Sequence, residues 1–369
     1  MRSKVILLSG FLGAGKTTTM IRAAKMMEAA GKKVAIVTND QGSALIDTAL
    51  GRNSGLWTEE VSGGCFCCRF DDLLTTLQTL RETQSPDVIL AEAVGSCTDL
   101  SATVIHPMKH YYQDDFEVAP LTILVDPKRM VKSIPAIDSL AFSNSVHYIF
   151  EKQIEEADII AINKLDQYAE EEIDTMIEVL NQRYPDAMIL PISAARGDHM
   201  EQLIYEWMNS TISGNQWLDL DYEKYAKGEA ALAWLNLRAE ASSISRLDIK
   251  KWMMEFVNEL EVHFILEKMI VAHMKVLIEH DGGFVKASID STGADPVILE
   301  VGEQVAQDFH LVLNLRVETS PERLDESVRM ALSAANTEFP LEFHVTHHEC
   351  FRPAPPAPTH RWTKNHPHR

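Results

Sequence analysis

Short apolar runs recur along the first half of the chain, and polar residues or glycine follow each run directly. The runs cover residues 5–8, 34–38, 87–91, 121–125, 158–162 and 189–192. Runs of this length with polar boundaries are typical of buried strands. A helical pattern over residues 18–30, which ends at Gly31, separates the first two runs. Strands that alternate with helical segments predict an α/β domain with a mostly parallel sheet.

The second half of the chain has a different order of elements. Residues 215–230 are polar and aromatic, and they are expected to link a domain at 1–214 to a second domain at 231–350. Alternating and continuous apolar patterns predict strands at 232–240, 271–280, 284–289, 309–317 and 341–346, and helices at 247–260 and 321–337. Ser320 and Pro321 suit the cap and first turn of the later helix. This order indicates a smaller α+β domain of ferredoxin-like type, with its helices on one face of the sheet.

A glycine-rich loop connects the first strand to the first helix. Residues 10–17, GFLGAGKT, fit the pattern G-x-x-x-x-G-K-[ST] of the phosphate-binding P-loop. Glycines let successive backbone N–H groups point at a phosphate, the lysine adds positive charge near the β- and γ-phosphates, and the threonine hydroxyl can bind Mg²⁺. A glycine-rich turn without a ligand is the alternative, but the flanking strand and helix favour a nucleotide site. The predicted phosphate-binding residues are Gly10, Gly13, Ala14, Gly15, Lys16, Thr17 and Thr18.

Two later strand ends indicate which base the nucleotide carries. Asn163-Lys164-Leu165-Asp166 follows the run at 158–162, and Asp166 can accept hydrogen bonds from the N1 and N2 donors of guanine, which adenine lacks. Ser193 and Ala194 follow the last run and resemble the loop that donates a backbone N–H to guanine O6. Because both segments follow a P-loop, we expect GTP rather than ATP. The predicted base-binding residues are Asn163, Lys164, Asp166, Ser193 and Ala194.

Acidic residues stand at two further strand ends. Asp40 follows the run at 34–38, and Glu92 follows the run at 87–91. The carboxyl ends of parallel strands lie at one edge of the sheet, so both acids are expected near the γ-phosphate and Mg²⁺. A helix cap or a surface position is the alternative for each, and Asp126 is a third candidate. Lys16, Asp40 and Glu92 are the predicted catalytic residues.

A cysteine triplet lies between these two acids in the sequence. Cys65, Cys67 and Cys68 supply three of the five cysteines of the chain. Adjacent cysteines pair poorly in a disulfide, and clustered thiolates in a reducing compartment bind metal or carry out redox chemistry. Three sulfurs favour zinc, with cobalt(II) or nickel(II) as alternatives, and a site with an open fourth position suits the release of metal. Buried cysteines without metal and a closed structural zinc site remain the other interpretations.

These motifs together resemble one protein family. GFLGAGKTTT, GCFCC at 64–68, EAVG at 92–95 and NKLD at 163–166 make residues 4–210 similar to the CobW-type metal-chaperone GTPases, relatives of the GTPases that insert nickel into urease and hydrogenase. The resemblance implies a slow GTPase that uses GTP/GDP and Mg²⁺, holds zinc or cobalt at Cys65, Cys67 and Cys68, and delivers it to a client protein. It also implies that Glu92 senses the metal or binds Mg²⁺. Relatives often act as dimers, so a homodimer is left open.

The chain departs from the family pattern at three places. Residues 39–42 read NDQG where the family usually has N-E-F-G, and residues 92–95 read EAVG where it often has E-T-x-G. The first departure leaves the role of Asp40 open. Cys97 lies outside the familiar pattern, as a fourth thiolate or, as we favour, a small buried residue.

The composition limits the partners and the compartment. A net charge of −20 argues against nucleic acid and anionic membranes as partners, and no apolar run reaches the length of a membrane span. Cleavage of a signal peptide would destroy the P-loop, so residues 4–9 are interpreted as a strand. Together with the thiol cluster, this predicts a cytoplasmic protein.

The end of the chain has an unusual composition. His344, His347, His348 and Cys350 precede a proline-rich stretch at 353–358, and further histidines follow. A metal-collecting segment and a solvated surface are the two interpretations, of which we favour the surface. Residues 351–369 are expected to be an extended tail that contributes nothing to a packed core.

The order of the motifs suggests a mechanism. GTP and Mg²⁺ would hold the segment between Asp40 and Glu92 in one arrangement, and hydrolysis would relax it, so that metal affinity depends on the nucleotide. No glutamine or arginine stands out as the hydrolytic residue, which predicts a low intrinsic rate. Two rival functions are a GTP-dependent accessory protein for a corrinoid or nickel enzyme, with structural cysteines, and a plain nucleotide-dependent kinase.

Overall fold

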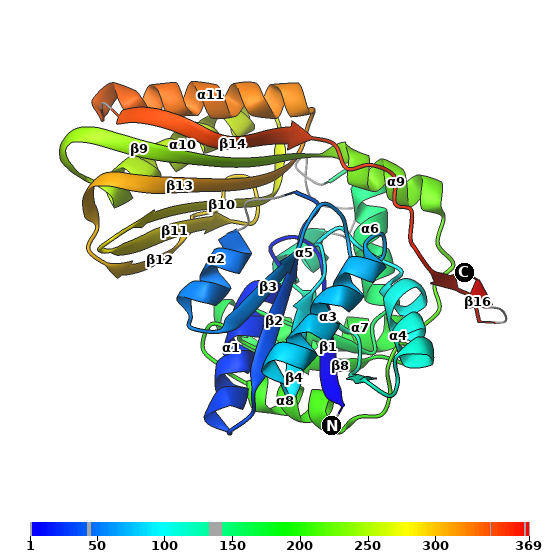
Figure 1. Ribbon diagram of the computed structural model, residues 1–369. Coiled ribbons are helices and arrows are strands. Elements are labelled where there is room, and N and C mark those ends of the chain that lie inside the picture. Colours follow the sequence, from blue (N-terminus) through cyan, green and yellow to red (C-terminus); the bar gives the residue numbers. More distant parts are fainter. Residues whose placement is uncertain (1, 43–45, 133–141, 340, 365–366, 369) are drawn as a thin grey trace.

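The computed structural model describes residues 2–42, 46–132, 142–339, 341–364 and 367–368. They form an N-terminal α/β domain and a second domain whose sheet lies across it (Figure 1). The first sheet has the strand order β3-β2-β4-β1-β6-β7-β8, with all pairs parallel and β5 beside β1. Its strands are β1 Ser3–Ser9, β2 Val34–Asn39, β3 Trp57–Val61, β4 Val88–Glu92, β5 Phe116–Val118, β6 Thr122–Val125, β7 Ile159–Ile162 and β8 Met188–Pro191.

Helices cover both faces of this sheet (Figure 1). Alternate residues of β1 enter two separate cores, Val5 and Leu7 on one face and Ile6 and Leu8 on the other. A strand buried on both faces has no polar face, which is why it appears in the sequence as a continuous apolar run. The helices are α1 Lys16–Ala29, α2 Ile46–Asn53, α3 Phe70–Gln84, α4 His106–Tyr111, α5 Pro127–Lys132, α6 Asn144–Glu155, α7 Glu170–Arg183 and α8 Met200–Asn209, and a π-helical turn at Ser101–Ile105 leads into α4.

The edge strand β3 was not predicted from the sequence. Of its residues, WTEEV, only Thr58 and Val61 are buried, and Trp57 is half exposed. β3 pairs only with β2 among the described strands, so one side needs no apolar cover. An edge strand of five residues therefore gives too weak an apolar signal to be recognised.

The segment expected as a linker contains a helix, α9 Tyr222–Ala231. The carboxylate of Asp221 caps it by accepting hydrogen bonds from the backbone N–H groups of residues 223 and 224. A Cβ at Gly228 would lie 2.3 Å from the carbonyl oxygen of Ser145, so α9 packs closely on α6. The connection between the two domains is therefore held by packing.

The second domain is a sheet with two helices on one face. Its elements are β9 Leu232–Asp248, α10 Ile249–Leu266, β10 Ile270–His280, β11 Gly283–Ile289, β12 Val297–Gly302, β13 Val305–Glu318, α11 Pro321–Glu338 and β14 Leu341–Phe351. The antiparallel strand order is β12-β11-β10-β13-β9-β14. The four strands β14-β9-β13-β10 have the ferredoxin-like order that the sequence predicted, and β11 and β12 extend it at one edge. The exposed edge strand β12 was not predicted.

The other face of this second sheet packs against the N-terminal α/β domain. Val276 and Ile278 of β10 enter the core beneath α10 and α11, whereas Leu277 packs with Ile46 and Leu50 of α2. Successive residues of a strand point to opposite faces of its sheet. The residues two positions before and two positions after Leu277 therefore share the face that turns toward α2. Among the described residues, no helix is long and apolar enough to cross a membrane.

Candidate nucleotide and metal site

A cavity of about 940 Å³ lies between the glycine loop and the second sheet. The glycine loop, the start of α1 and the strand ends of the parallel sheet form one wall, and residues of β10, β11 and β13 form the opposite wall. The volume is in the range of pockets that bind small ligands and cofactors. The carboxyl ends of the parallel strands therefore meet a second domain here instead of open solvent.

The glycine loop has the backbone that its sequence demands. Gly10, Gly13 and Gly15 all have positive φ, which other residues adopt only with strain. A Cβ at Gly15 would lie 2.3 Å from Nδ2 of Asn163, so this glycine also allows the base-reading loop to approach. The Lys16 ammonium donates to the carbonyl oxygen of Gly10 at 2.8 Å. The exposed Thr18 lines the cavity at the start of α1.

Thr17 lies between two carboxylates. Its Oγ1 is 2.8 Å from Oε2 of Glu92 and 2.8 Å from Oδ1 of Asp47. Burial and the neighbouring Asp47 raise the pKa of Glu92 to about 7, against the opposing effect of Lys16. A hydroxyl and two carboxylates are the hard oxygen donors that Mg²⁺ prefers, so these three residues fit that ion. Asp47 could not be found from the sequence, because it lies within α2 and does not directly follow a predicted strand.

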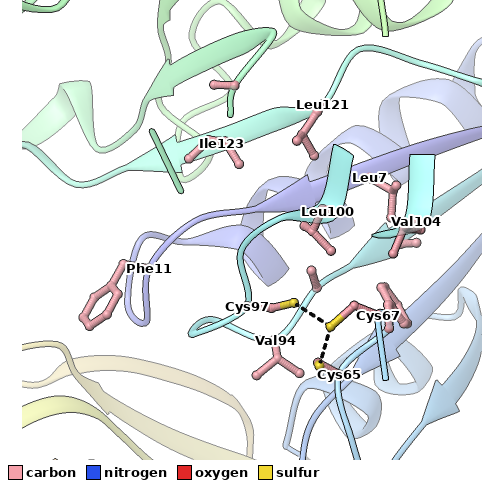
Figure 2. Close-up of a cluster of buried hydrophobic side chains, with 14 of the residues drawn as sticks. Leu7, Phe11, Cys65, Cys67, Val94, Cys97, Leu100, Val104, Leu121 and Ile123 are labelled. Atoms are coloured by element: carbon pink, nitrogen blue, oxygen red, sulfur yellow. Dashed lines mark hydrogen bonds between the residues drawn. The ribbon is translucent and has the colours of Figure 1, made fainter. Parts of the chain in front are cut away.

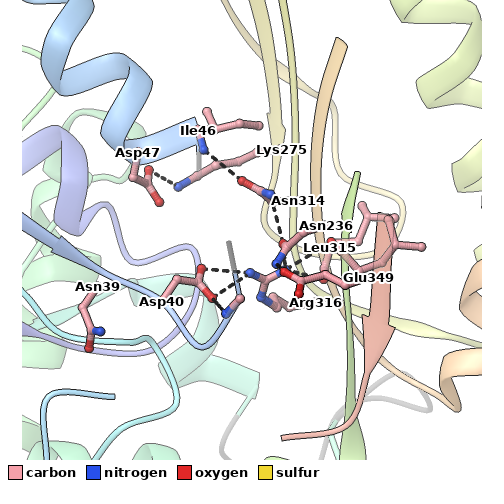
Figure 3. A network of polar contacts seen from close by, with 12 residues as sticks. Asn39, Asp40, Ile46, Asp47, Asn236, Lys275, Asn314, Leu315, Arg316 and Glu349 are labelled. Carbon is pink, nitrogen blue, oxygen red and sulfur yellow. Dashed lines mark hydrogen bonds and ion pairs between the residues drawn. The ribbon is translucent and has the colours of Figure 1, made fainter. Parts of the chain in front are cut away.

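Asp40 lines the cavity but has a different partner from Glu92. Its Oδ2 accepts from Arg316 of β13 at 2.8 Å (Figure 3). The Arg316 guanidinium is almost fully buried and also lies 4.0 Å from the ring centroid of Trp234. Asp40 therefore connects the first domain to the second, an arrangement that no motif in the sequence indicated.

The residues predicted to bind the base lie close together. Nδ2 of Asn163 donates to the carbonyl oxygen of Ala14 at 2.9 Å, and its Oδ1 accepts from the backbone N–H of Ala194 at 3.1 Å. The hydroxyl of Ser193 donates to the carboxylate of Asp166. Asn163 thus joins the glycine loop to the Ser193-Ala194 loop.

Lys164 has two acidic neighbours. Its ammonium lies 2.7 Å from Oδ2 of Asp126, the third acidic candidate, and also pairs with Asp290 at the end of β11. The backbone carbonyl of Asp290 accepts from Arg129 of α5. The second domain therefore contacts the base-reading loop as well as the residues near the phosphates.

The cysteine triplet forms a compact group of sulfurs. The Sγ atoms of Cys65, Cys67 and Cys68 all lie within 4.8 Å of one another. The distances are 2.8 Å between Cys65 and Cys67, 3.4 Å between Cys65 and Cys68, and 3.8 Å between Cys67 and Cys68. Zinc–sulfur bonds of about 2.3 Å in a tetrahedral site place sulfurs about 3.8 Å apart. The Cys67–Cys68 distance matches this spacing, and Cys65 would have to move away from the other two sulfurs for the three thiols to bind a soft or borderline metal ion in this geometry. Cys65 and Cys67 are buried, and Cys68 is partly exposed.

Cys97 lies beside this group, within the core. Its Sγ is 3.7 Å from that of Cys67 (Figure 2), and the side chain is fully buried among Val94, Leu100 and Val104. Hydrogen bonds from Cys65 and Cys67 lower the pKa of Cys97 to about 7. The hydrogen bond with Cys65, together with burial, raises the pKa of Cys68 to about 11. Metal binding to the protonated thiols must therefore release protons.

Asn39 at the end of β2 anchors the cysteine loop. Its Nδ2 donates to the carbonyl oxygen of Gly64 at 2.8 Å, and its Oδ1 accepts from the backbone N–H of Phe66 at 3.0 Å. The next residue, Asp40, lines the nucleotide cavity. The end of β2 therefore contacts the backbone of the cysteine loop and also lines the cavity.

A buried carboxyl group forms a second connection between these regions. Oε1 of Glu229, in α9, accepts from Nε2 of Gln41 at 2.9 Å and from the hydroxyl of Ser96 at 2.7 Å. Burial raises the pKa of Glu229 to about 8. Gln41 follows Asp40 and Ser96 precedes Cys97, so α9 contacts the segments on both sides of the site.

The tail does not match the expectation of an extended segment without packing. The backbone N–H of Thr359 donates to the carbonyl oxygen of Cys67 at 2.9 Å, and that of Ala357 lies 3.2 Å from Sγ of Cys68. Pro353 is buried, and two short strands follow, β15 Arg361–Trp362 and β16 Pro367–His368. Figure 1 shows the tail running past α9 onto the first domain. The proline-rich composition concealed this packing, because the contacts use backbone groups.

The histidines near the end of β14 lie apart from the sulfurs. His348 pairs with Asp325 of α11 at 2.7 Å, and the Cys350 thiol donates to the carbonyl oxygen of Pro321. Within the part of the chain that the structure describes, only Cys65, Cys67 and Cys68 form a group of three or more metal-binding side chains. The histidine segment thus forms no metal-binding group of this kind.

The fold and the site define a class of protein. A glycine loop, a threonine beside two acids, and an Asn-Lys-x-Asp loop stand at the carboxyl ends of a parallel sheet, which is the arrangement of a P-loop nucleotide-binding protein. The chain belongs to the CobW/HypB/UreG family, because the model of that family's nucleotide-binding domain matches residues 4–191. The resemblance inferred from the motifs is therefore confirmed.

Two curated relatives are each similar to less than half of this chain. The zinc chaperone YeiR of Escherichia coli (strain K12) is 30% identical over 167 residues, which are 44% of this chain and 46% of that protein. The zinc chaperone CobW of Sinorhizobium sp is 30% identical over 178 residues, 43% of this chain and 50% of the other. The chain thus spans about half the length of the curated relatives that it matches.

A solved structure aligns over a greater length but with little similarity. The crystal structure of Zn(II)-bound YjiA GTPase from E. coli covers 90% of this chain and 98% of its own, with 14% sequence identity and a TM-score of 0.39. A likeness of this size carries no argument about the site.

Proposed function

We propose that this protein is a GTP-binding metallochaperone that hydrolyses GTP slowly, holds zinc at Cys65, Cys67 and Cys68, and passes it to a client metalloprotein. The observation that carries the proposal is the shared strand end of β2. Asn39 hydrogen-bonds the cysteine loop, and the adjacent Asp40 lines the nucleotide cavity. A change at the terminal phosphate can therefore reach the sulfurs through two neighbouring residues.

Each residue type suits its part in this function. The P-loop amides and Lys16 would bind the phosphates, and Asp166 would accept hydrogen bonds from guanine. Thr17, Asp47 and Glu92 would hold Mg²⁺, which supplies charge neutralisation at the phosphates when bound. The carboxyl group of Glu92, with a pKa of about 7, can take up or release a proton near neutral pH.

The sulfur donors and the printed names of the relatives support zinc as the cargo. Both curated relatives described above are named zinc chaperones. Cobalt(II) binds the same donors and remains the second choice. The three thiols are free in the structure, which suits a reducing compartment such as the cytoplasm.

The test is a zinc titration in two nucleotide states. The protein is loaded with GDP or with a non-hydrolysable GTP analogue, and zinc affinity is measured by competition with a chromophoric chelator. We expect the two affinities to differ by about tenfold or more, which corresponds to about 1.4 kcal/mol of coupling. By reciprocity, zinc should change the affinity for the GTP analogue by the same factor.

Two variants make the titration specific. Replacing Cys65, Cys67 and Cys68 by serine should abolish tight zinc binding, whereas Cys350→Ser should leave it unchanged, because Cys350 lies outside the sulfur group. Equal zinc affinity in both nucleotide states would remove the basis for delivery by a GTP switch. Tight binding that ignores the nucleotide would instead support the accessory protein with structural cysteines.

A further inference from the structure

The second sheet presents a row of polar side chains to the nucleotide cavity. His273 and Lys275 of β10, Lys286 of β11, and Asn314 and Arg316 of β13 all line it. They alternate along their strands with residues of the core under α10 and α11, such as Val276, Ala287 and Leu315. The sheet therefore has one apolar face for its own helices and one basic face for the cavity.

Two of these basic residues already pair with acids of the first domain. Lys275 binds Asp47, and Arg316 binds Asp40 at 2.8 Å (Figure 3). Asn314 supports the same contact by accepting from the backbone N–H of Ile46 at 3.0 Å. Asp47 in turn lies beside Thr17 of the P-loop. Lys275 thus reaches the place where the P-loop threonine is expected to bind Mg²⁺ beside the terminal phosphates.

Lys286 has no such partner. No hydrogen bond or ion pair joins its ammonium to any described residue, although burial and the nearby charge of Lys275 lower its pKa to about 8. Asp47 and Glu92 attract this ammonium electrostatically, without a hydrogen bond or ion pair, and so raise its pKa. The Lys286 side chain is partly buried. A partly buried ammonium without a charged partner loses hydration, and a ligand of opposite charge can supply the missing contact.

The charges around this lysine favour an anion. The cluster that interacts electrostatically here contains four cations and three acids: Lys16, Lys275, Lys286, Arg316, Asp40, Asp47 and Glu92. Lys275 and Lys16 come from opposite walls of the cavity and are close enough to repel each other. Because Lys16 is the P-loop lysine, the anion that separates these cations would be the end of a nucleotide's phosphate chain.

We propose that Lys275 and Lys286 of the second sheet bind the terminal phosphate of the nucleoside triphosphate, so that the second domain distinguishes a triphosphate from a diphosphate. This inference rests on the proposed function in taking the ligand to be a guanine nucleotide. It assigns to the second domain the positive charge that no arginine or glutamine of the first domain was expected to supply. It also implies that the contact between the two domains is stronger when a γ-phosphate is bound.

The test compares two nucleotides in matched lysine variants. Affinities for a fluorescent GDP and for the equivalent non-hydrolysable GTP analogue are measured for the full-length wild type, Lys286→Met and Lys275→Met. We expect each variant to lose about tenfold or more in affinity for the triphosphate, the usual effect of one charge-assisted contact. Affinity for GDP should change by less than about twofold, because GDP lacks the group that these lysines contact.

Two controls separate ligand binding from structure. Lys250→Met removes a lysine of the same domain that pairs with Glu300 outside the cavity, and it should leave both affinities unchanged. Lys286→Met removes a partly buried charge that has no partner among the described residues, so its melting temperature without nucleotide should equal or exceed that of the wild type. Lys275→Met leaves Asp47 without its partner, and if that variant fails to fold, Lys286→Met carries the test.

The outcomes are distinguishable. Equal loss of both nucleotides, or no change in the ratio of the two affinities, would overturn the assignment of Lys286 and Lys275. Preference of the wild type for adenine nucleotides would contradict the proposed function alone, and the ADP and ATP-analogue pair would then test the lysines in the same way. If the wild type binds no triphosphate, both proposals are wrong.

Discussion

Glu229 shows how one buried side chain can make the stability of the site depend on pH. Its pKa of about 8 is well above the ordinary value of 4.5, because burial disfavours the charged form. Between those two pH values the folded protein keeps a proton that the unfolded chain releases, so stability falls as pH rises through the window. Below it, both states are protonated and the carboxyl group has no such effect.

Glu229→Gln should remove this dependence. The amide keeps an oxygen that can accept from Gln41 and Ser96, and it has no proton to lose. We expect the variant to be similar to the wild type at pH 4.5 and more stable at pH 8, by on the order of a few kcal/mol. Urea unfolding at both pH values measures this, with Glu223→Gln on the exposed side of the same helix as the control. Parallel pH profiles would contradict the prediction.

Cys97 offers a second prediction at the scale of a single residue. Its sulfur approaches Cys67, but it lies outside the three sulfurs that are within 4.8 Å of one another. We therefore expect Cys97→Ala to bind one zinc ion with nearly wild-type affinity and to lose about 1–2 kcal/mol of stability through a small cavity. Cobalt(II) substitution gives an independent reading, because the sulfur-to-metal absorption band should keep its intensity. A drop in that intensity would show that Cys97 is a ligand.

At the scale of elements, the tail covers the partly exposed cysteine. Backbone N–H groups of Ala357 and Thr359 contact Cys68 and Cys67, and the ring of His360 lies 5.0 Å from that of Phe70. Access to the sulfur group from solvent is therefore limited by a segment whose described residues form no group of three metal-binding side chains.

Deletion of residues 353–369 should expose Cys68. We expect its reaction with a maleimide to accelerate by on the order of tenfold in the zinc-free protein, because the gain in access outweighs the loss of the Ala357 hydrogen bond, which lowers the pKa of the Cys68 thiol. Peptide mapping by mass spectrometry follows each cysteine separately. Cys350, whose thiol contacts Pro321, serves as the internal control and should react at an unchanged rate. An unchanged rate at Cys68 would show that the tail does not restrict access.

At the scale of the whole molecule, buried ion pairs hold the two domains together. Arg316 is almost fully buried and donates to Asp40, which belongs to the other domain. Removing one partner of a buried pair is costly, because the remaining charge has no counter-ion. The contact thus stabilises one particular arrangement of the domains around the cavity.

A double-mutant cycle measures this contact. Asp40→Ala should lower the free energy of unfolding by about 3 kcal/mol, because it leaves the guanidinium buried beside Trp234 with one acceptor fewer. Arg316→Met in the same chain should recover part of that loss, with a coupling energy of about 2 kcal/mol. Additive effects in urea unfolding would show that the pair does not join the domains energetically.

The N-terminal elements could be predicted because their physics is local. Buried parallel strands must be apolar on both faces, and a phosphate loop needs glycines at positions with positive φ, so both leave a continuous signal in the sequence. The edge strands β3 and β12 leave no such signal, because part of each faces solvent. α9 was missed for a related reason, since its packing depends on a close approach to α6 at Gly228.

The residues of the candidate site fall into the same two groups, those that a local sequence pattern reveals and those that only tertiary packing brings together. The sequence by itself determined the P-loop, the Asn-Lys-x-Asp loop, Glu92 and the three clustered cysteines, because each motif lies within a few consecutive residues. Only the tertiary structure brought Asp47, Lys275, Lys286 and Arg316 to the cavity and the tail to Cys68. Alternation along β10 places Lys275 opposite the apolar core, but it cannot say what that face will meet. Contacts between residues hundreds of positions apart are decided by the packing of whole domains, which no local pattern records.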